Sequence, residues 1–155
     1  MSKTQTYQDV FKEIAAVIEG ESNMMARMVT MICLLNEAFE DYFWTGVYLV
    51  DPNNPKELVV GPYQGTLGCL RIPFGKGVCG TAAQRRETVI VEDVHAFPGH
   101  IACDARSESE IVVPLLDREG VLLGVLDVDS TRKAAFDEED KLGLEVICRH
   151  VCEAA

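Results

Sequence analysis

The chain has 155 residues, 48% of them hydrophobic and 25% charged, with a formal net charge of -11. This length suits one domain with its own hydrophobic core, and this composition is typical of soluble folded proteins, so it argues against extended disorder. Proteins that bind polyanions need clustered lysine and arginine side chains, and the acidic balance therefore argues against nucleic acid and anionic membrane surfaces as partners.

Two amphipathic helices are predicted at the start of the chain. Residues 5–19 and residues 22–39 each repeat apolar side chains at the spacing of one helical face. Ser22 and Asn23 follow a break at Gly20 and are suitable N-caps for the second helix. We therefore expect two helices that each bury one face.

Strands and one short helix are predicted for the middle of the chain. The loop signal PNNPK separates two segments rich in strand-forming residues, which predicts a β-hairpin. A second hairpin is predicted around the turn DREG, and the acidic run Asp137–Glu139 marks the first turn of a last helix. In chain order, the segments are strands at 44–51 and 57–64, an extended segment at 69–74, a short helix at 77–86, a strand at 88–93, a long loop, strands at 109–117 and 121–130, and a helix at 136–153.

This order of elements predicts an α/β fold. Helices at both ends enclose a set of antiparallel strands, so we expect one central, mainly antiparallel sheet flanked by helices, in a single domain over residues 1–155. No internal repeat or low-complexity segment interrupts the chain. The amphipathic terminal helices could also form a dimer face, so a homodimer stays open.

The start of the chain and its hydropathy predict a cytoplasmic location. The first residues hold no apolar region typical of a signal peptide, and no apolar run is long enough to span a bilayer. In the cytoplasm, six cysteines would be kept as thiols. A disulfide among them is then more often transient than structural.

The cysteines fall into two groups. Three lie in segments with apolar residues at helical spacing, and we expect these to pack as small hydrophobic side chains: Cys33, Cys148 and Cys152. The other three lie in segments rich in glycine and turn residues, where a thiol is accessible and can ionise: Cys69, Cys79 and Cys103. Because the second group contains no C-x-x-C and no cysteine–histidine pattern of a zinc finger, we expect redox chemistry there rather than a structural metal site.

Two carboxylates interrupt the apolar run VLLGVLDVDS, which otherwise predicts a buried strand. In a strand, Asp127 and Asp129 project from one face about 6–7 Å apart. Glu110 opens the preceding strand and could join them across the hairpin. Two carboxylates in one pocket repel each other and lose water, which raises the pKa of at least one and keeps a proton available for general acid catalysis. For Asp129, next to Ser130, the alternative is a frayed strand end in solvent.

Five segments carry a resemblance to a known family: WTGVYLV, GPYQG, CLRIPFGKGVCGTA, EDVHAFPGHIACDARSESEIVVPL and GVLDVDS. The order of elements resembles that of the GAF domain, a small-molecule-binding fold related to PAS domains. More narrowly, the five segments are similar to those of the free methionine-(R)-sulfoxide reductases, over nearly the whole chain. The resemblance implies an oxidoreductase that reduces free L-methionine (R)-sulfoxide to methionine, with thioredoxin as reductant and without a metal or organic cofactor.

The resemblance also implies roles for the cysteines. Sulfoxide reduction needs a thiolate that attacks sulfur, an acid that protonates the departing oxygen, and a second thiol that converts the sulfenic acid into a disulfide. The family implies that Cys103 is the nucleophile, that Cys69 resolves its sulfenic acid, and that Cys79 is an additional exchange partner. The residues alone leave this order open, because Cys79 lies at the predicted start of a helix near Lys76, where we expect a lowered pKa.

The family further implies how the substrate is held. Glu110, Asp127 and Asp129 hold its ammonium group and sulfoxide oxygen, which explains a preference for a free amino acid over a peptide residue. Trp44 walls the pocket beside the substrate methyl group and sulfur, although a tryptophan at the start of a buried strand is equally expected in an ordinary core. Two other classes stay open: a GAF-type redox or small-molecule sensor module, and a peroxide-reducing thiol protein that would not need the acidic pair.

Overall fold

The structure, a computed structural model, describes residues 1–101 and 103–153. Each predicted helix and strand is present, with boundaries that differ by a few residues. The described part of the chain also holds one element that the sequence did not indicate, a 3-10 helix. In chain order, the elements are α1 (Lys3–Val17), α2 (Met24–Ala38), β1 (Trp44–Asp51), β2 (Asn54–Gln64), β3 (Arg71–Pro73), α3 (Gly77–Arg85), β4 (Val89–Val91), η1 (Val94–Ala96), β5 (Ser109–Leu116), β6 (Leu122–Ser130) and α4 (Glu138–Glu153).

Side chains cap the helices that pack on the sheet. Of the two predicted caps of α2, Asn23 fills the position, because its side chain accepts a hydrogen bond from the backbone N–H of Ala26. Ahead of α4, the Asp137 carboxylate accepts a hydrogen bond from the backbone N–H of Glu139. Each cap satisfies a helical N–H group that has no partner within its own helix.

The six strands that the structure describes form one sheet in the order β3-β2-β1-β6-β5-β4, and each neighbouring pair is antiparallel. The two predicted hairpins are β1–β2 and β5–β6. β2 begins inside the predicted turn, because Asn54 pairs with Asp51 and only Pro52 and Asn53 remain between the strands. The predicted α/β fold, with one central antiparallel sheet flanked by helices, is confirmed.

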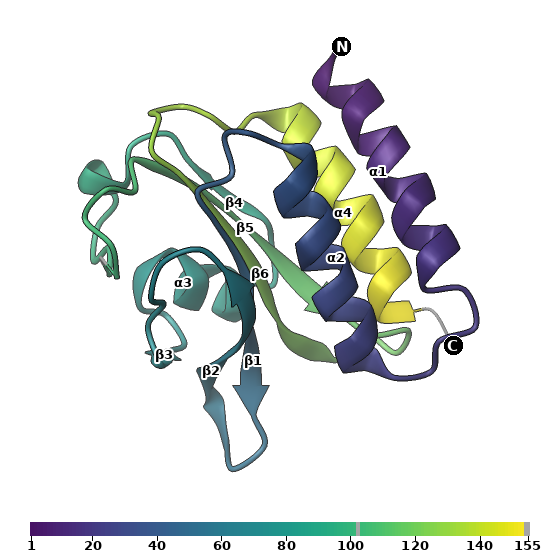
Figure 1. The fold of residues 1–155 in the computed structure, drawn as a ribbon. Coiled ribbons are helices and arrows are strands. Elements are labelled where there is room, and N and C mark those ends of the chain that lie inside the picture. The colour runs from purple at the N-terminus through teal and green to yellow at the C-terminus, as the bar shows by residue number, and fades with distance from the viewer. Residues whose placement is uncertain (102, 154–155) are drawn as a thin grey trace.

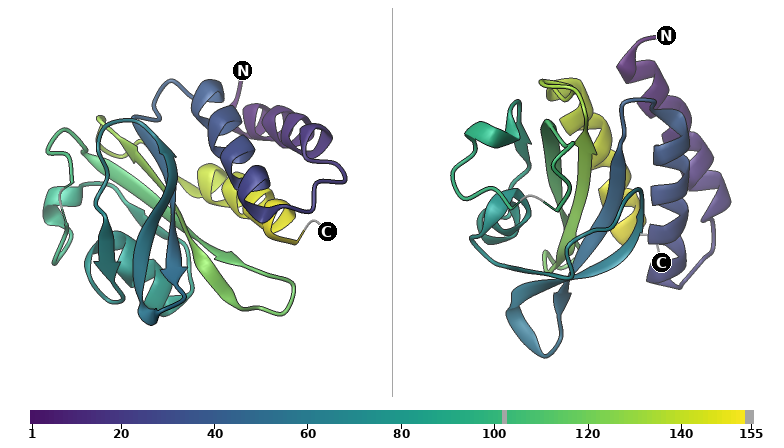
Figure 2. Two further views of the ribbon diagram at one scale, coloured as in Figure 1. Left: turned by 60° about the horizontal axis from the view of Figure 1, so that its bottom comes forward. Right: turned by 60° about the vertical axis from the view of Figure 1, so that its left-hand side comes forward.

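The helices are divided unequally between the two faces of the sheet (Figure 1). α1, α2 and α4 lie together over one face, which we call the helical face. The other face carries α3, with the segment between β4 and β5 beside it, and we call it the α3 face (Figure 2). Within the described residues, no helix has both the length and the hydropathy needed to cross a bilayer.

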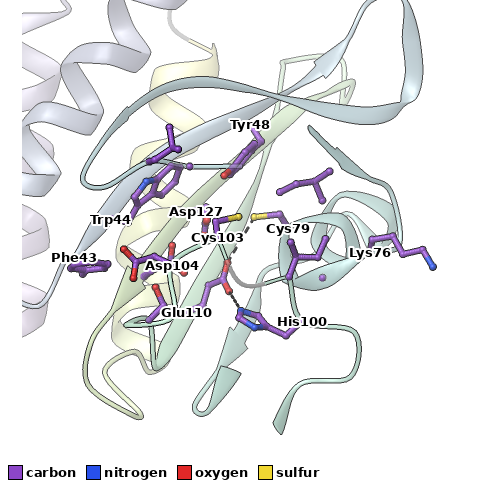
Figure 3. A pocket seen from close by; sticks show the side chains of 17 residues that line it. Phe43, Trp44, Tyr48, Lys76, Cys79, His100, Cys103, Asp104, Glu110 and Asp127 are labelled. Carbon is purple, nitrogen blue, oxygen red and sulfur yellow. Dashed lines mark hydrogen bonds and ion pairs between the residues drawn. The ribbon is translucent and has the colours of Figure 1, made fainter. Parts of the chain in front are cut away.

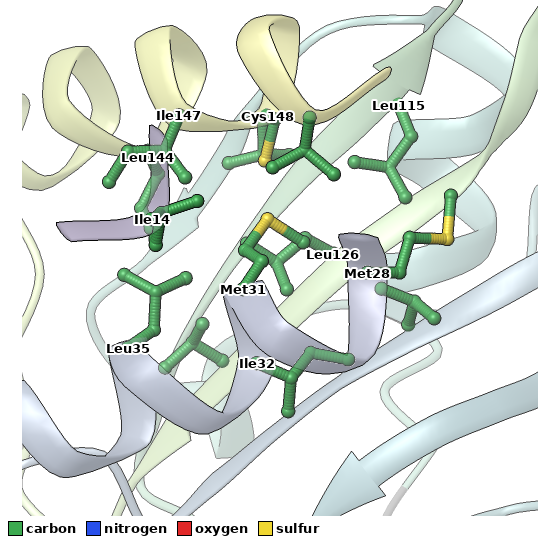
Figure 4. Close-up of a cluster of buried hydrophobic side chains, with 14 of the residues drawn as sticks. Ile14, Met28, Met31, Ile32, Leu35, Leu115, Leu126, Leu144, Ile147 and Cys148 are labelled. Atoms are coloured by element: carbon green, nitrogen blue, oxygen red, sulfur yellow. The ribbon is translucent and has the colours of Figure 1, made fainter. Parts of the chain in front are cut away.

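Alternation along the strands sends successive side chains into two different cores. On the helical face, Ile14 of α1, Leu126 of β6 and Leu144 of α4 are fully buried in one cluster (Figure 4). Cys148 and Cys152 are buried in the same cluster, which confirms that they pack as small hydrophobic side chains. This core therefore contains two of the three thiols that the sequence separates from redox chemistry, whereas Cys33 of α2 is half-buried and is not a member of the cluster.

The core of the α3 face is smaller and incomplete. Ala82 of α3 packs with Val112 of β5 and Val125 of β6, all of them fully buried. At the end of the α3 face where β1 begins and β6 ends, carboxylates replace the apolar side chains. There, Trp44 of β1 pairs with Asp129 of β6 in the sheet register. The polar end of the α3 face is where the predicted site residues meet.

Candidate active site

Strand register gathers three carboxylates on the α3 face. Glu110 of β5 lies directly opposite Asp129 of β6, and Asp127 lies two residues before Asp129. Opposite residues and residues two apart share a face, so all three side chains point the same way and line one cavity. Figure 3 labels Glu110 and Asp127 among the side chains of this cavity. Glu110 and Asp127 are each 5% exposed and Asp129 is half-buried. The alternative of a frayed strand end in solvent therefore does not hold for Asp129.

Burial and mutual repulsion raise the pKa of all three carboxyl groups. Loss of water is the larger cause at each position. The next cause is the negative charge of a neighbouring carboxylate. Asp127 raises the pKa of Glu110, Asp129 raises the pKa of Asp127, and Glu110 raises the pKa of Asp129. Groups coupled in this way share their protons, so the cluster keeps a proton towards neutral pH.

Asp127 has an acceptor atom that the protein does not use. Its Oδ1 atom is buried and accepts no hydrogen bond from any residue that the structure describes. A buried carboxylate oxygen without a partner is costly, and this residue lines the cavity. The arrangement favours a ligand that brings a cationic or hydrogen-bond-donating group to this point.

Cys79 of α3 contacts the carboxylate cluster. Its side chain is 4% exposed, and its Sγ atom lies 3.8 Å from Oε2 of Glu110. Burial, followed by the charges of Asp127 and Glu110, raises the pKa of this thiol well above its ordinary value. The prediction of an accessible thiol with a lowered pKa is wrong, because the start of α3 does not outweigh burial beside carboxylates and Lys76 points away from the cavity (Figure 3).

A disulfide joins Cys69 and Cys103, whose Cα atoms are 5.5 Å apart, within the usual range. Cys103 is exposed and lines the cavity, whereas Cys69 is half-buried. In Figure 3, the sulfur atoms of Cys103 and Cys79 face each other. The structure thus brings the three predicted redox cysteines together beside the carboxylates.

Hydrogen bonds tie the two disulfide loops together as well. Thr66 Oγ1 donates a hydrogen bond to Asp104 Oδ2 over 2.7 Å. The guanidinium group of Arg106 donates to both oxygens of Asp104. These bonds, that of Arg106 first, hold the pKa of Asp104 well below its usual range. The ionised Asp104 therefore fixes the loop of Cys103 against the loop of Cys69.

Trp44 is both a wall of the cavity and part of the core. Its Nε1 atom donates a hydrogen bond to the carbonyl oxygen of Thr66 over 2.8 Å, and its ring stacks on Tyr63 with 4.9 Å between centroids. A Cβ atom at Gly68 would lie 2.8 Å from the indole ring, so glycine makes room for it. Trp44 is 4% exposed and still lines the cavity. The two interpretations of this residue, a wall of the pocket and an ordinary core residue, therefore both hold.

This combination of fold and site has counterparts among known proteins. The family model described as the GAF domain matches residues 6–154. The chain belongs to the GAF domain family.

Two relatives of this GAF domain are named free methionine-R-sulfoxide reductase. The one from Escherichia coli (strain K12) is 46% identical over 144 residues, which cover 93% of this chain and 85% of the relative. The one from Saccharomyces cerevisiae is 37% identical over 153 residues, which cover 96% of this chain and 85% of the relative. Within the GAF family, the chain groups with the proteins of this name.

A solved structure of a free methionine-R-sulfoxide reductase, from Neisseria meningitidis and in complex with its substrate, is similar to this chain in fold as well. It is 46% identical in sequence, and the superposition has a TM-score of 0.92. The superposition covers 99% of this chain and 89% of that one. The similarity therefore extends over the cavity and both disulfide loops.

The GAF domain brings two further residues to the cavity. His100 lies with its Nε2 atom 3.8 Å from Oε1 of Glu110, and burial lowers the pKa of this imidazole, which is therefore neutral at neutral pH. The sequence placed His100 in the loop before Cys103, but no spacing links a loop histidine to a strand carboxylate. Tyr48 of β1 also lines the cavity, where its ring stacks on that of Trp44 with 5.7 Å between centroids.

Proposed function

We propose that this protein reduces free methionine (R)-sulfoxide to methionine by cysteine chemistry, with Cys103 as the nucleophile and Cys69 as the resolving thiol. One observation carries the proposal: the disulfide between these residues adjoins a cavity that holds the carboxylate cluster of Glu110, Asp127 and Asp129. A pair of thiols that closes to a disulfide can remove an oxygen atom, and carboxyl groups can hold a cation and supply a proton. The relatives named for this activity support the proposal.

The carboxylates select a free amino acid. The substrate ammonium group binds Glu110 and Asp127 and gives the buried Oδ1 atom of Asp127 the donor that it lacks. A methionine sulfoxide within a peptide has an uncharged amide nitrogen instead, so it loses this attraction. The face of Trp44 contacts the methyl group and sulfur of the substrate.

In the first step, the Cys103 thiolate attacks the sulfoxide sulfur. A protonated carboxyl of the cluster gives its proton to the sulfoxide oxygen, because burial and repulsion keep that proton bound. The sulfur–oxygen bond of the substrate breaks, the oxygen ends on Cys103 as a sulfenic acid, and methionine leaves.

In the second step, the Cys69 thiolate attacks the sulfenic sulfur of Cys103. The disulfide forms, and the oxygen takes up the proton that the Cys69 thiol released and leaves as water, so two thiols are oxidised while the sulfoxide is reduced to a thioether. The high pKa of Cys79 disfavours it as the attacking thiolate, and its place opposite Cys103 suits a later thiol–disulfide exchange. Thioredoxin, a dithiol, then reduces the disulfide through the exposed Cys103.

A coupled assay with thioredoxin, thioredoxin reductase and NADPH tests this function. We expect NADPH consumption with free methionine (R)-sulfoxide, and none above background with the S epimer or with a peptide that contains the (R)-sulfoxide. Equal turnover of both epimers, or consumption of hydrogen peroxide without turnover of the sulfoxide, rejects the proposal. Binding of the (R)-sulfoxide to the reduced protein without turnover favours a sensor module instead.

A further inference from the structure

One thiol of the cavity lies among carboxylates at the separations of metal ligands. The Sγ atom of Cys79 and one oxygen each of Glu110 and Asp127 lie within 4.8 Å of one another. Sγ of Cys79 and Oε2 of Glu110 are 3.8 Å apart. In a tetrahedral zinc site, a sulfur and an oxygen ligand are about 3.5 Å apart, as follows from bonds of about 2.3 Å and about 2.0 Å. Small side-chain movements are enough to close this cluster around an ion.

We propose that Cys79, Glu110 and Asp127 bind a thiophilic divalent cation of the zinc class, and that this ion competes with the sulfoxide substrate for the cavity. The competition rests on the proposed function, because it assumes that the substrate ammonium group uses the same carboxylates. The metal site itself does not rest on it.

The buried oxygen of Asp127 is an independent indication of a cationic ligand. Asp127 is 5% exposed, and its Oδ1 atom accepts no hydrogen bond from any described residue. The other two members of the cluster, Cys79 and Glu110, carry no positive charge that could compensate this oxygen. A dication would relieve the repulsion between the carboxylates and satisfy this oxygen at the same time.

The cations near the cavity leave the cluster uncompensated. Lys76 points away from it, and Arg106 is engaged with Asp104. The imidazole of His100 also lines the cavity, with its Nε2 atom 3.8 Å from Oε1 of Glu110. An imidazole nitrogen is a ligand of zinc, so His100 can serve as a fourth metal ligand.

The donor set selects among metal ions. One sulfur and two carboxylate oxygens suit Zn²⁺ and Co²⁺, whereas Mg²⁺ and Ca²⁺ are bound by oxygen atoms alone. When the metal–sulfur bond forms, the proton of the Cys79 thiol leaves to solvent and no oxidation state changes. The metal therefore binds Cys79 in spite of the high pKa that burial gives this thiol.

A titration of the oxidised protein with Co²⁺ tests the site. With Cys69 and Cys103 joined, Cys79 is the thiol that lines the described cavity, so an absorption band for charge transfer from sulfur to Co²⁺ reports on it. We expect this band to saturate at one ion per chain and to vanish when Zn²⁺ displaces Co²⁺. Cys79→Ser should abolish the band, and Asp127→Asn should weaken Co²⁺ binding at least about tenfold.

Two matched variants control for other ligands. Cys148→Ser removes a buried thiol of the helical face, and His95→Ala removes an imidazole from the group that it forms with Asp93 and Glu108. Both should keep the cobalt band and its affinity. A missing band in the native sequence, or a band that survives Cys79→Ser, overturns the metal site whether or not the protein reduces sulfoxide.

The competition is measured in the reduced double variant Cys69→Ser/Cys103→Ser, which keeps Cys79 and cannot turn over. Free methionine (R)-sulfoxide should raise the apparent dissociation constant of Co²⁺ in proportion to its concentration. If the sulfoxide binds and the cobalt band does not change, the shared cavity is refuted. Reductase activity is measured separately in the presence of a chelator, which removes bound metal. A loss of reductase activity is then distinguished from a loss of metal binding.

Discussion

Two buried thiols on opposite faces of the sheet show that burial alone does not define a reactive site. Cys148 on the helical face is 3% exposed and Cys79 on the α3 face is 4% exposed, and burial raises the pKa of both well above the ordinary value. Cys148 belongs to the apolar cluster of Leu144 and Ile147, whereas Cys79 contacts the carboxylate of Glu110. The chemistry of the α3 face therefore comes from the groups that the strands bring to it.

The largest effect is expected from the exposed cysteine of the α3 face. Cys103→Ser should lower the turnover of methionine (R)-sulfoxide by at least about a thousandfold, since it removes the nucleophile. Cys148→Ser should keep the turnover close to that of the native sequence, because its side chain is buried in the core of the opposite face. The coupled NADPH assay measures both, and trapping of the sulfenic acid with a dimedone probe identifies the thiol that attacks. Sulfenic acid formed at the native rate in Cys103→Ser would reverse the assigned roles.

Two neighbouring residues of β6 sharpen the contrast between the faces. Leu126→Ala opens a cavity in the helical-face core, where Leu126 is fully buried. We expect it to lower the free energy of unfolding by about 2–5 kcal/mol, with little change in KM. Asp127→Asn removes a charge from the α3 face and should lower kcat/KM by about 10- to 100-fold. Because it also removes repulsion and an unpartnered carboxylate, its melting temperature should rise by at least about 2 °C.

Thermal denaturation and kinetics on the same preparations separate the two variants. Leu126→Ala should be the less stable protein and the more active one. If Asp127→Asn lost stability as Leu126→Ala does, the carboxylate would be part of the structural core and not a binding group.

The stability of the α3 face should depend on pH in the direction that the raised carboxyl pKa values set. As pH rises past the ordinary values of 3.8 for Asp127 and 4.5 for Glu110, the unfolded chain loses these protons first, and the folded protein is destabilised until its own groups ionise. The unfolding free energy of the native sequence should therefore fall relative to that of Asp127→Asn as pH rises above 3.8. Urea denaturation at each pH measures the difference, and a gap independent of pH would contradict the raised pKa of Asp127.

Local sequence patterns predicted the strands and the shared face of the acidic residues. The surroundings of the cysteine thiols could not be predicted in this way, because they depend on contacts between segments far apart in the sequence. The alternation of a strand puts Asp127 and Asp129 on one face, and the hairpin at the DREG turn sets Glu110 opposite Asp129. The pKa of Cys79 was predicted from its helix start and from the nearby Lys76, but Glu110, which is 31 residues away in the sequence, contacts it. The contact of His100 with the same carboxylate depends on how a long loop folds back, which no period in the sequence encodes.

The smallest effect is expected from the hydrogen bond between the two disulfide loops. Thr66→Val removes the donor to Asp104 while keeping the size of the side chain. A typical side-chain hydrogen bond contributes about 0.5–1.5 kcal/mol, so the rate of disulfide formation in a single turnover should fall by about 2- to 10-fold if the bond aligns Cys69 with Cys103. Thr30→Val, which removes a similar bond to the Ala26 carbonyl oxygen within α2, is the matched control and should leave that rate unchanged. Both variants lose one hydroxyl group. An equal rate of disulfide formation in Thr66→Val and Thr30→Val would therefore mean that the hydrogen bond between Thr66 and Asp104 does not align the two loops.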